Sequence, residues 1–170
     1  AKDFEGLRQS LVISPNEAAY TLSVTILDDL LVEGEESLRL TLSNYQNAQP
    51  GTITETVVTI ADNDVVRLAV RDVVVDEDAG SVALVITQSI TSTLESVVDV
   101  RTQPGNATSP EDFDALFTTV VIPPGSTAAT VTVQLNGDDE VEPTETFSVV
   151  LEDPTNAIIE DGTAIVTVLD

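Results

Sequence analysis

Most of this sequence is present twice. Matching segments lie 109 positions apart, or 108 after one deletion: Asp3-Phe4 with Asp112-Phe113, DDLLVEGEE (28–36) with GDDEVEPTE (137–145), and VVTIAD (57–62) with IVTVLD (165–170). We call residues 3–62 the first copy and residues 112–170 the second copy. A repeat of this kind requires each copy to belong to one structural unit of a tandem array.

Residues 65–111 lie between the copies and match nothing earlier in the chain. We therefore expect a complete repeat over 65–170, and over 1–64 the C-terminal portion of another repeat that is truncated at its N-terminal side. On this interpretation the chain is a fragment of a longer tandem array. A truncated repeat leaves sheet edges open, so we also expect strand exchange or self-association through it.

Polar and apolar residues alternate with period two in many short segments, which is typical of strands with one buried face. Gly, Pro, Asn and Asp separate these segments. The pattern predicts an all-β chain of tandem seven-stranded antiparallel immunoglobulin-like β-sandwiches. The expected strands are 21–26, 38–42 and 56–60, then 66–70, 81–87, 96–102, 118–122, 130–135, 147–151 and 164–168.

The charge is strongly negative: 30 Asp and Glu face six Lys and Arg, for a net charge of −24. Scattered basic residues cannot bind nucleic acid or an anionic lipid surface, and no apolar run is long enough to insert into a membrane. Without Cys or His there is no thiol nucleophile, imidazole base or ordinary zinc site. We therefore expect no catalysis, although paired acids of glycosidase type remain an alternative.

The acidic residues gather at the ends of the expected strands. Alternate loops of an antiparallel sandwich emerge at one end, so several carboxylates would meet there and repel each other unless a cation lay among them. Calcium takes six to eight oxygen ligands with flexible geometry, whereas magnesium demands stricter geometry. Neither copy matches a contiguous calcium loop. The sequence predicts a calcium site built from several loops, with a solvated acidic surface as the alternative.

The acidic knots DDLLVEGEE and GDDEVEPTE, the closing TIADND and TVLD, and the stretches SPEDF and DEDAGSV resemble the Calx-β repeat family over almost the whole chain. The resemblance implies a seven-stranded immunoglobulin-like sandwich that binds several calcium ions at one tip. By position it implies these metal ligands: Asp3, Asp28, Asp29, Glu33, Glu36, Asp62 and Asp64 in the first repeat, and Glu77, Asp112, Asp138, Glu142, Glu145 and Asp170 in the second.

The chain departs from the family pattern at two of these places. Gly137 stands where calcium-binding members have the first aspartate of the knot, and where the first copy has Asp28. The first repeat has no counterpart of Glu77. Each predicted site is therefore incomplete within this sequence.

These features together predict a non-catalytic, calcium-binding repeat module of a large secreted or cell-surface protein of bacterial origin. Calcium would stiffen the joint between repeats at Asp62-Asn63-Asp64, and so present an adhesive or other domain. Neighbouring repeats and calcium ions are the expected partners. Two alternatives stay open: a cytosolic calcium-sensing module of a transporter, and a metal-free spacer.

Overall fold

The computed structural model describes residues 2–138 and 140–170, and the described chain is all-β apart from one short 3₁₀ turn. The chain forms two compact units. The first unit comprises residues 1–30 and 35–61, and the second comprises residues 31–34 and 62–170. Within the described residues, no helical segment reaches the length and hydropathy of a membrane-spanning helix.

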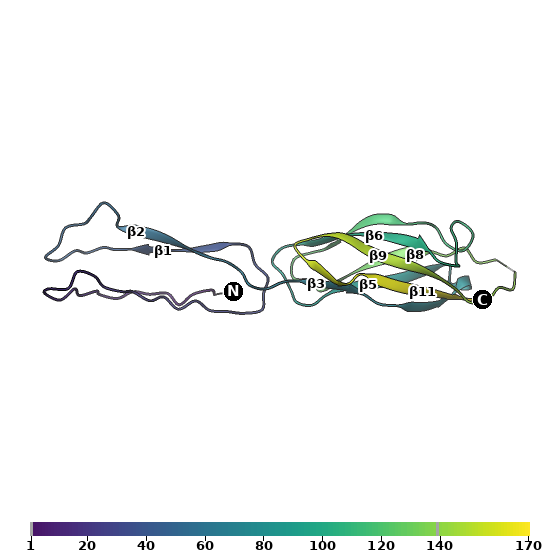
Figure 1. The fold of residues 1–170 in the computed structure, drawn as a ribbon, viewed down its shortest axis with the longest axis horizontal. Coiled ribbons are helices and arrows are strands. Elements are labelled where there is room, and N and C mark those ends of the chain that lie inside the picture. The colour runs from purple at the N-terminus through teal and green to yellow at the C-terminus, as the bar shows by residue number, and fades with distance from the viewer. Residues whose placement is uncertain (1, 139) are drawn as a thin grey trace. The chain divides into compact units, whose positions relative to one another are not determined.

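The second unit contains two sheets that face each other across one apolar core, as a sandwich does (Figure 1). The four-stranded sheet has the order β10-β3-β5-β8, and the five-stranded sheet has the order β4-β11-β9-β6-β7. The strands are β3 (Arg67–Val70), β4 (Val73–Asp76), β5 (Ser81–Gln88), β6 (Ser96–Pro104), β7 (Phe117–Ile122), β8 (Ala128–Gln134), β9 (Glu145–Thr155), β10 (Ile158–Asp161) and β11 (Thr163–Leu169).

The edge of the sandwich explains why the described second unit has nine strand segments where the sequence predicts seven. The expected strand 66–70 forms as β3, and after a break at Arg71-Asp72 the chain adds β4, which was not predicted and belongs to the other sheet. The Asp72 carboxylate accepts a hydrogen bond from the N–H of Ile165 at 2.8 Å, which ties this crossing to β11. β10 is too short to show any alternation. A 3₁₀ turn, η1 (Glu77–Ala79), joins β4 to β5 in the opposite sheet.

The core of the second unit follows the predicted alternation. In β5 the buried residues Val82, Leu84 and Ile86 alternate with exposed ones. Phe113 and Phe147 are fully buried and stack with ring centroids 4.1 Å apart and an interplanar angle of 17°. Burial of such side chains is the main stabilising contribution to a domain of this size.

The first unit contains one antiparallel pair, β1 (Glu36–Thr41) with β2 (Glu55–Ile60), and these strands correspond to β9 and β11 of the second unit. The strand predicted over 21–26 does not form. Its only ladder contact in the described chain is an isolated bridge between Phe4 and Ile26. In the second unit the matching strand β8 obtains its hydrogen bonds from β5, and the first copy has no segment that matches β5 within this sequence.

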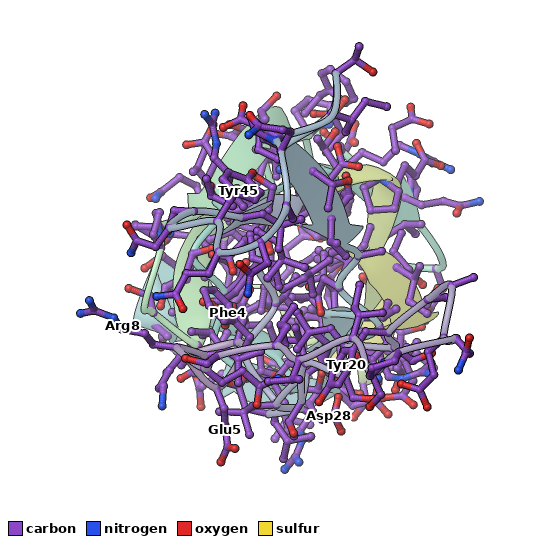
Figure 2. The ribbon with its side chains drawn as sticks, turned by 90° about the vertical axis from the view of Figure 1, so that its left-hand side faces the viewer. Phe4, Glu5, Arg8, Tyr20, Asp28 and Tyr45 are labelled. Carbon is purple, nitrogen blue, oxygen red and sulfur yellow. The ribbon has the colours of Figure 1, made fainter. Side chains whose placement is uncertain are left out.

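Apolar side chains of the first unit are exposed at positions where the second unit buries them. Ile13 is 56% exposed and its counterpart Ile122 is 0% exposed, and Leu42 is 51% exposed against 4% for Leu151. Two charged residues of the first unit, Glu5 and Arg8, are also exposed, and their side chains point away from the ribbon (Figure 2). The first unit therefore keeps the sequence pattern of a sandwich without the covering sheet.

Candidate metal centre

Three connections of the second unit, and the residue after its last strand, place carboxylates at one end of the sandwich. Asp112 lies between β6 and β7, and Glu142 and Glu145 lie at the connection from β8 to β9. Glu77 starts the turn η1, and Asp170 follows β11 directly. These residues are up to 93 positions apart in sequence, and the antiparallel topology brings their loops to the same pole.

Three of these carboxylates form a compact group. Asp112, Glu142 and Glu145 each offer an oxygen, and these oxygens lie within 4.8 Å of one another. Glu77 and Asp170 line the same small hollow, together with Asn136. Oxygens at this spacing can be bridged by one hard cation with bonds of about 2.3–2.6 Å.

Backbone hydrogen bonds hold the carboxylates in place. The N–H of Thr108 donates to Asp112 Oδ2 at 2.6 Å, and the N–H of Glu142 donates to Asp170 Oδ2 at 3.2 Å. The N–H of Asp138 donates to Glu77 Oε1 at 3.4 Å, so the knot is also attached to η1. The Asp112 carboxylate is thus oriented within its own loop, whereas those of Glu77 and Asp170 are oriented by the knot. Asp139, within the same knot, lies outside the described residues.

The surroundings raise the pKa values of two groups above their ordinary value. Partial removal from water raises the pKa of Glu142, and the charges of Asp112 and Asp138 raise it further. Partial removal from water also raises the pKa of Glu145, followed by the charge of Asp112 and a hydrogen bond with it. Without a cation the ionised group is thus electrostatically unfavourable, which is the condition under which a bound divalent ion contributes most.

Gly137 has a local reason for departing from the aspartate of the first copy. A Cβ atom built on Gly137 would lie 3.1 Å from the carbonyl oxygen of Glu77 and 3.2 Å from its carbonyl carbon. The knot therefore approaches the backbone of η1 so closely that a side chain fits only if η1 moves. The glycine permits the close approach that lets Asp138 hydrogen-bond to Glu77, and it supplies no side-chain ligand.

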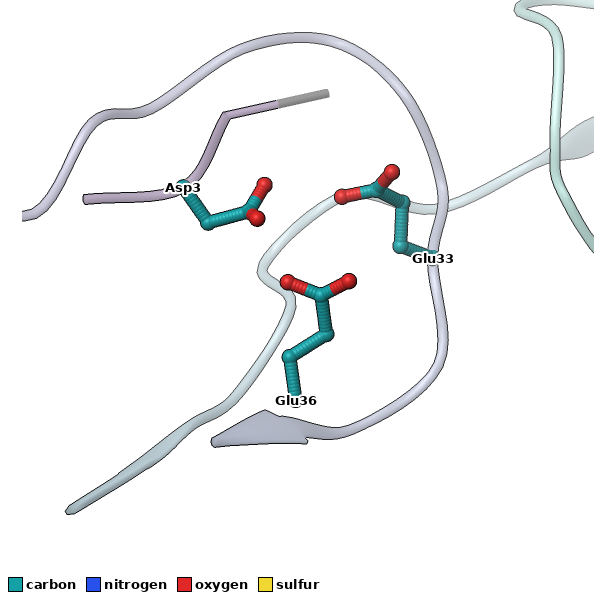
Figure 3. A group of neighbouring side chains, drawn as sticks. All are labelled: Asp3, Glu33 and Glu36. Carbon is teal, nitrogen blue, oxygen red and sulfur yellow. The ribbon is translucent and has the colours of Figure 1, made fainter. Parts of the chain in front are cut away.

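In the first copy Asp3, Glu33 and Glu36 also offer oxygens within 4.8 Å of one another (Figure 3). The N–H of Glu33 donates to Asp62 Oδ2 at 2.7 Å, and the N–H of Asp64 donates to Asp62 Oδ1 at 3.0 Å. Among the other predicted ligands, Asp28 and Asp29 lie in the same connection but outside the group of three. The structure thus brings together part of the predicted set, and the ligand role of each residue stays a prediction.

One contributor to the second group was not predicted from the sequence. Asn136 lines the hollow, and its Nδ2 donates to the carbonyl oxygen of Pro110 at 2.8 Å and to Asp114 Oδ1 at 3.2 Å. Its backbone N–H donates to the Asp112 carbonyl oxygen at 3.0 Å, so Asn136 fixes the loop that carries Asp112. A signal was present, because Asn136 directly precedes the knot, but an amide does not stand out among 30 acids.

Comparison with known protein families decides the classification. The Calx-beta domain model matches residues 1–64 and again residues 60–170. The chain belongs to the Calx-beta domain family. The resemblance inferred from the acidic knots is confirmed, and so is the all-β sandwich class.

Two relatives of this Calx-beta chain are extracellular matrix proteins. Extracellular matrix protein 3 of Lytechinus variegatus is 30% identical over 186 residues, which cover 99% of this chain and 6% of that protein. FRAS1-related extracellular matrix protein 2 of Homo sapiens is 32% identical over 160 residues, covering 86% of this chain and 5% of that protein. The chain therefore spans about one-twentieth of the length of these relatives.

Solved Calx-beta structures share the fold. The apo-form Calx CBD1 domain has a TM-score of 0.59 at 22% identity, covering 63% of this chain and 98% of that one. The calcium binding domain CBD12 of CALX1.1 has a TM-score of 0.58 at 23% identity, covering 61% of this chain and 45% of that one. At these identities the comparison establishes the sandwich architecture of the second unit.

Proposed function

We propose that this chain is a non-catalytic, calcium-binding repeat module of a large extracellular protein. The observation that carries the proposal is that the two carboxylate groups occupy the same positions of the repeat. Asp3, Glu33 and Glu36 correspond one by one to Asp112, Glu142 and Glu145. A solvated acidic surface has no reason to converge on the same three positions twice.

Calcium is the cation that suits the donors. The groups offer only oxygen atoms, from loops whose backbones are irregular, and calcium accepts many oxygens in flexible geometry. Transition metals favour imidazole and thiolate, which this chain lacks. Partial removal from water raises the pKa values of Glu142 and Glu145, and nearby like charges raise them further; bound calcium would offset this charge repulsion.

The place of the sites in the sequence favours a mechanical role for calcium. Asp62 ends the first copy, and Asp64 directly precedes the second repeat. The Asp62 carboxylate accepts hydrogen bonds from the N–H groups of Glu33 and Asp64. Calcium held there would restrict the backbone at the joint between repeats. An extracellular location is supported by the two matrix relatives. The module would thus present other domains for adhesion or display.

Calcium titration by isothermal calorimetry, combined with thermal unfolding in calcium and in EDTA, tests the proposal. We expect calcium to bind and to stabilise the second unit, by about 2.7 kcal/mol at a free concentration 100 times the Kd. Magnesium at the same concentration should stabilise less. The double variant Glu142→Gln with Glu145→Gln keeps the side-chain shape and should lose most of this effect.

A control variant changes two acids outside the group, Glu152→Gln and Asp153→Asn, and should keep the calcium response. If calcium gives no heat and leaves the unfolding curve of the unaltered chain unchanged, the module is a metal-free spacer and the proposal is wrong. If calcium binds but small-angle scattering is the same in calcium and EDTA, the stiffening of the joint is wrong while calcium binding stands.

The first unit adds a second expected kind of partner. Its exposed apolar residues, among them Ile13 and Leu42, support strand exchange or self-association. Sedimentation at increasing protein concentration should reveal this association. If the protein sediments as a monomer at every concentration, and the apolar residues of the first unit stay exposed, the proposed self-association is wrong.

A further inference from the structure

Val32 and Val141 occupy the same position of the two copies but differ sharply in exposure. Val32 is 7% exposed and belongs to the core of the second unit, whereas Val141 is 92% exposed. Both stand directly before the first glutamate of their carboxylate group, Glu33 and Glu142. A valine that is almost fully exposed on a loop has no role in the packing of its own unit.

Thr91, Ser92 and Thr93, which we call the Val32 seat, contact Val32 and show what such a valine can bind. Within the second unit Val32 forms a parallel bridge with Ser92. The Val32 carbonyl oxygen accepts hydrogen bonds from the N–H of Thr93 at 2.9 Å, and from Ser92 Oγ and Thr93 Oγ1 at 3.2 Å each. The Val32 N–H donates to the carbonyl oxygen of Thr91 at 3.4 Å.

The Val32 seat binds the backbone of one residue through hydrogen bonds, and the side chain of that residue is buried in the core. Ser92 is 1% exposed, and its Oγ also accepts a hydrogen bond from the N–H of Leu94 at 2.9 Å, so the hydroxyl is held in place for Val32. None of Thr91, Ser92 and Thr93 carries a charge, so the adjacent glutamate meets no like charge from these three residues. Backbone pairing gives affinity, and burial of the valine side chain in the core gives selectivity, as in strand addition.

We infer that Val141 is a docking residue for a further repeat of this family, which it contacts through that repeat's counterpart of the Thr91–Thr93 seat. The 109-residue correspondence carries the pairing over: Val141 takes the place of Val32. A second copy of the present chain does not fit, because its own seat is filled by its own Val32. The required partner is a repeat with an unfilled neutral hydroxyl turn of the Thr-Ser-Thr kind.

The absence of cysteine makes a direct test available. Residues 63–170 are appended after Asp170, which reproduces the natural order Asp62-Asn63 and offers an unfilled seat to Val141. Single variants Val141→Cys and Val32→Cys are then compared for their reaction rate with a thiol reagent, in the 170-residue chain and in the extended chain. All measurements are made in EDTA, so they do not depend on calcium binding.

We expect Val32→Cys to react slowly in both chains. Val141→Cys should react fast in the 170-residue chain and slow by on the order of tenfold or more in the extended chain, because access would then require local opening. The matched control Val74→Cys, which is also exposed but lies on β4, should react equally in both chains. Changing the appended seat by Ser92→Asp should restore the fast reaction of Val141→Cys.

Two outcomes would overturn the inference. Equal rates for Val141→Cys in both chains would show that the valine stays in water. Slowing that depends on protein concentration, or that persists with Ser92→Asp in the appended seat, would show that something other than this seat covers it. Either result leaves the calcium titration unaffected, so the two proposals can fail separately.

Discussion

The backbone N–H of Glu142 donates a hydrogen bond to the carboxylate of Asp170, 3.2 Å away. The same bond joins the N–H of Glu33 to the carboxylate of Asp62 at 2.7 Å, and these residues hold the equivalent positions of the first copy. In both copies the acidic knot is therefore hydrogen-bonded to the aspartate that ends the copy, Asp62 or Asp170. In each copy the bond fixes the orientation of that aspartate's carboxylate relative to the knot.

Two substitutions at Asp170 should separate the effect of its hydrogen bond from that of its charge. Asp170→Asn keeps an oxygen acceptor for Glu142 and removes one negative charge, whereas Asp170→Ala removes both. In EDTA we expect the Asn variant to be more stable than the Ala variant by about 0.5–1.5 kcal/mol, the value of one hydrogen bond. Calcium affinity should fall in both, measured by calorimetry. Equal stability of the two variants would mean that the hydrogen bond contributes nothing.

Acid should stabilise the metal-free second unit. The pKa values of Glu142 and Glu145 are raised above the ordinary 4.5, so the folded state binds protons more tightly than the unfolded state. The free energy of unfolding in EDTA should therefore rise as the pH falls from neutral toward 4.5, and this gain should be absent when both residues are changed to Gln. Denaturant unfolding at several pH values measures it.

The pH range matters because the pKa of another carboxyl group, Glu152, is shifted in the opposite direction. The hydrogen bond from Arg101, at 2.7 Å, lowers the pKa of Glu152. That ion pair contributes stability above pH 4.5 and loses it as the pH falls further. Since both partners are more than one-third exposed, its contribution is small. A fall in stability between neutral pH and 4.5 in EDTA would contradict the prediction for the glutamates.

The stacked pair Phe113 and Phe147 should anchor the second unit. Both rings are fully buried, so Phe113→Ala should reduce the stability of this unit by about 3–5 kcal/mol. The matched substitution Phe4→Ala, at the equivalent position of the first copy, should cost much less because Phe4 is only half-buried. Differential scanning calorimetry compares the two. Similar losses would mean that the first unit has a covered core after all.

Restoring the aspartate that the first copy carries should not improve the second site. In Gly137→Asp the new Cβ would lie 3.1 Å from the carbonyl oxygen of Glu77, so the turn η1 must shift. We expect a loss of stability on the order of 1 kcal/mol in EDTA, and no gain in calcium affinity. Gly137→Ala is the control for the steric part. Tighter calcium binding by the Asp variant would show that η1 adapts freely.

The strands of the second unit could be predicted because alternation with period two reports directly which residues face a core. The same alternation misled at 21–26, since a strand needs a hydrogen-bonding neighbour as well as a pattern, and the neighbour of its counterpart β8 is β5. β4 and β10 were not predicted, and each is a segment of only four residues.

A gathering of acids in each copy could be predicted because equivalent carboxylates fall at strand ends in both copies. Which acids come together could not, since that depends on the path of each loop. Asp28 and Asp29 share a connection with Glu33 yet lie outside the group, and Asn136 enters the hollow through hydrogen bonds to residues 22 and 26 positions earlier. Such long-range contacts leave no trace in local sequence.

The break between β3 and β4, which takes β4 into the five-stranded sheet, has a mechanical consequence. β4 lies near the start of the second unit and runs parallel to β11 at its end, with pairs from Val73–Val166 to Asp76–Leu169. A pull on the two ends of this unit would draw these strands past each other in shear. The backbone hydrogen bonds between β4 and β11 would then be loaded at the same time, and could not break one after another. The place where force enters and leaves the unit is thus the place where it resists tearing most.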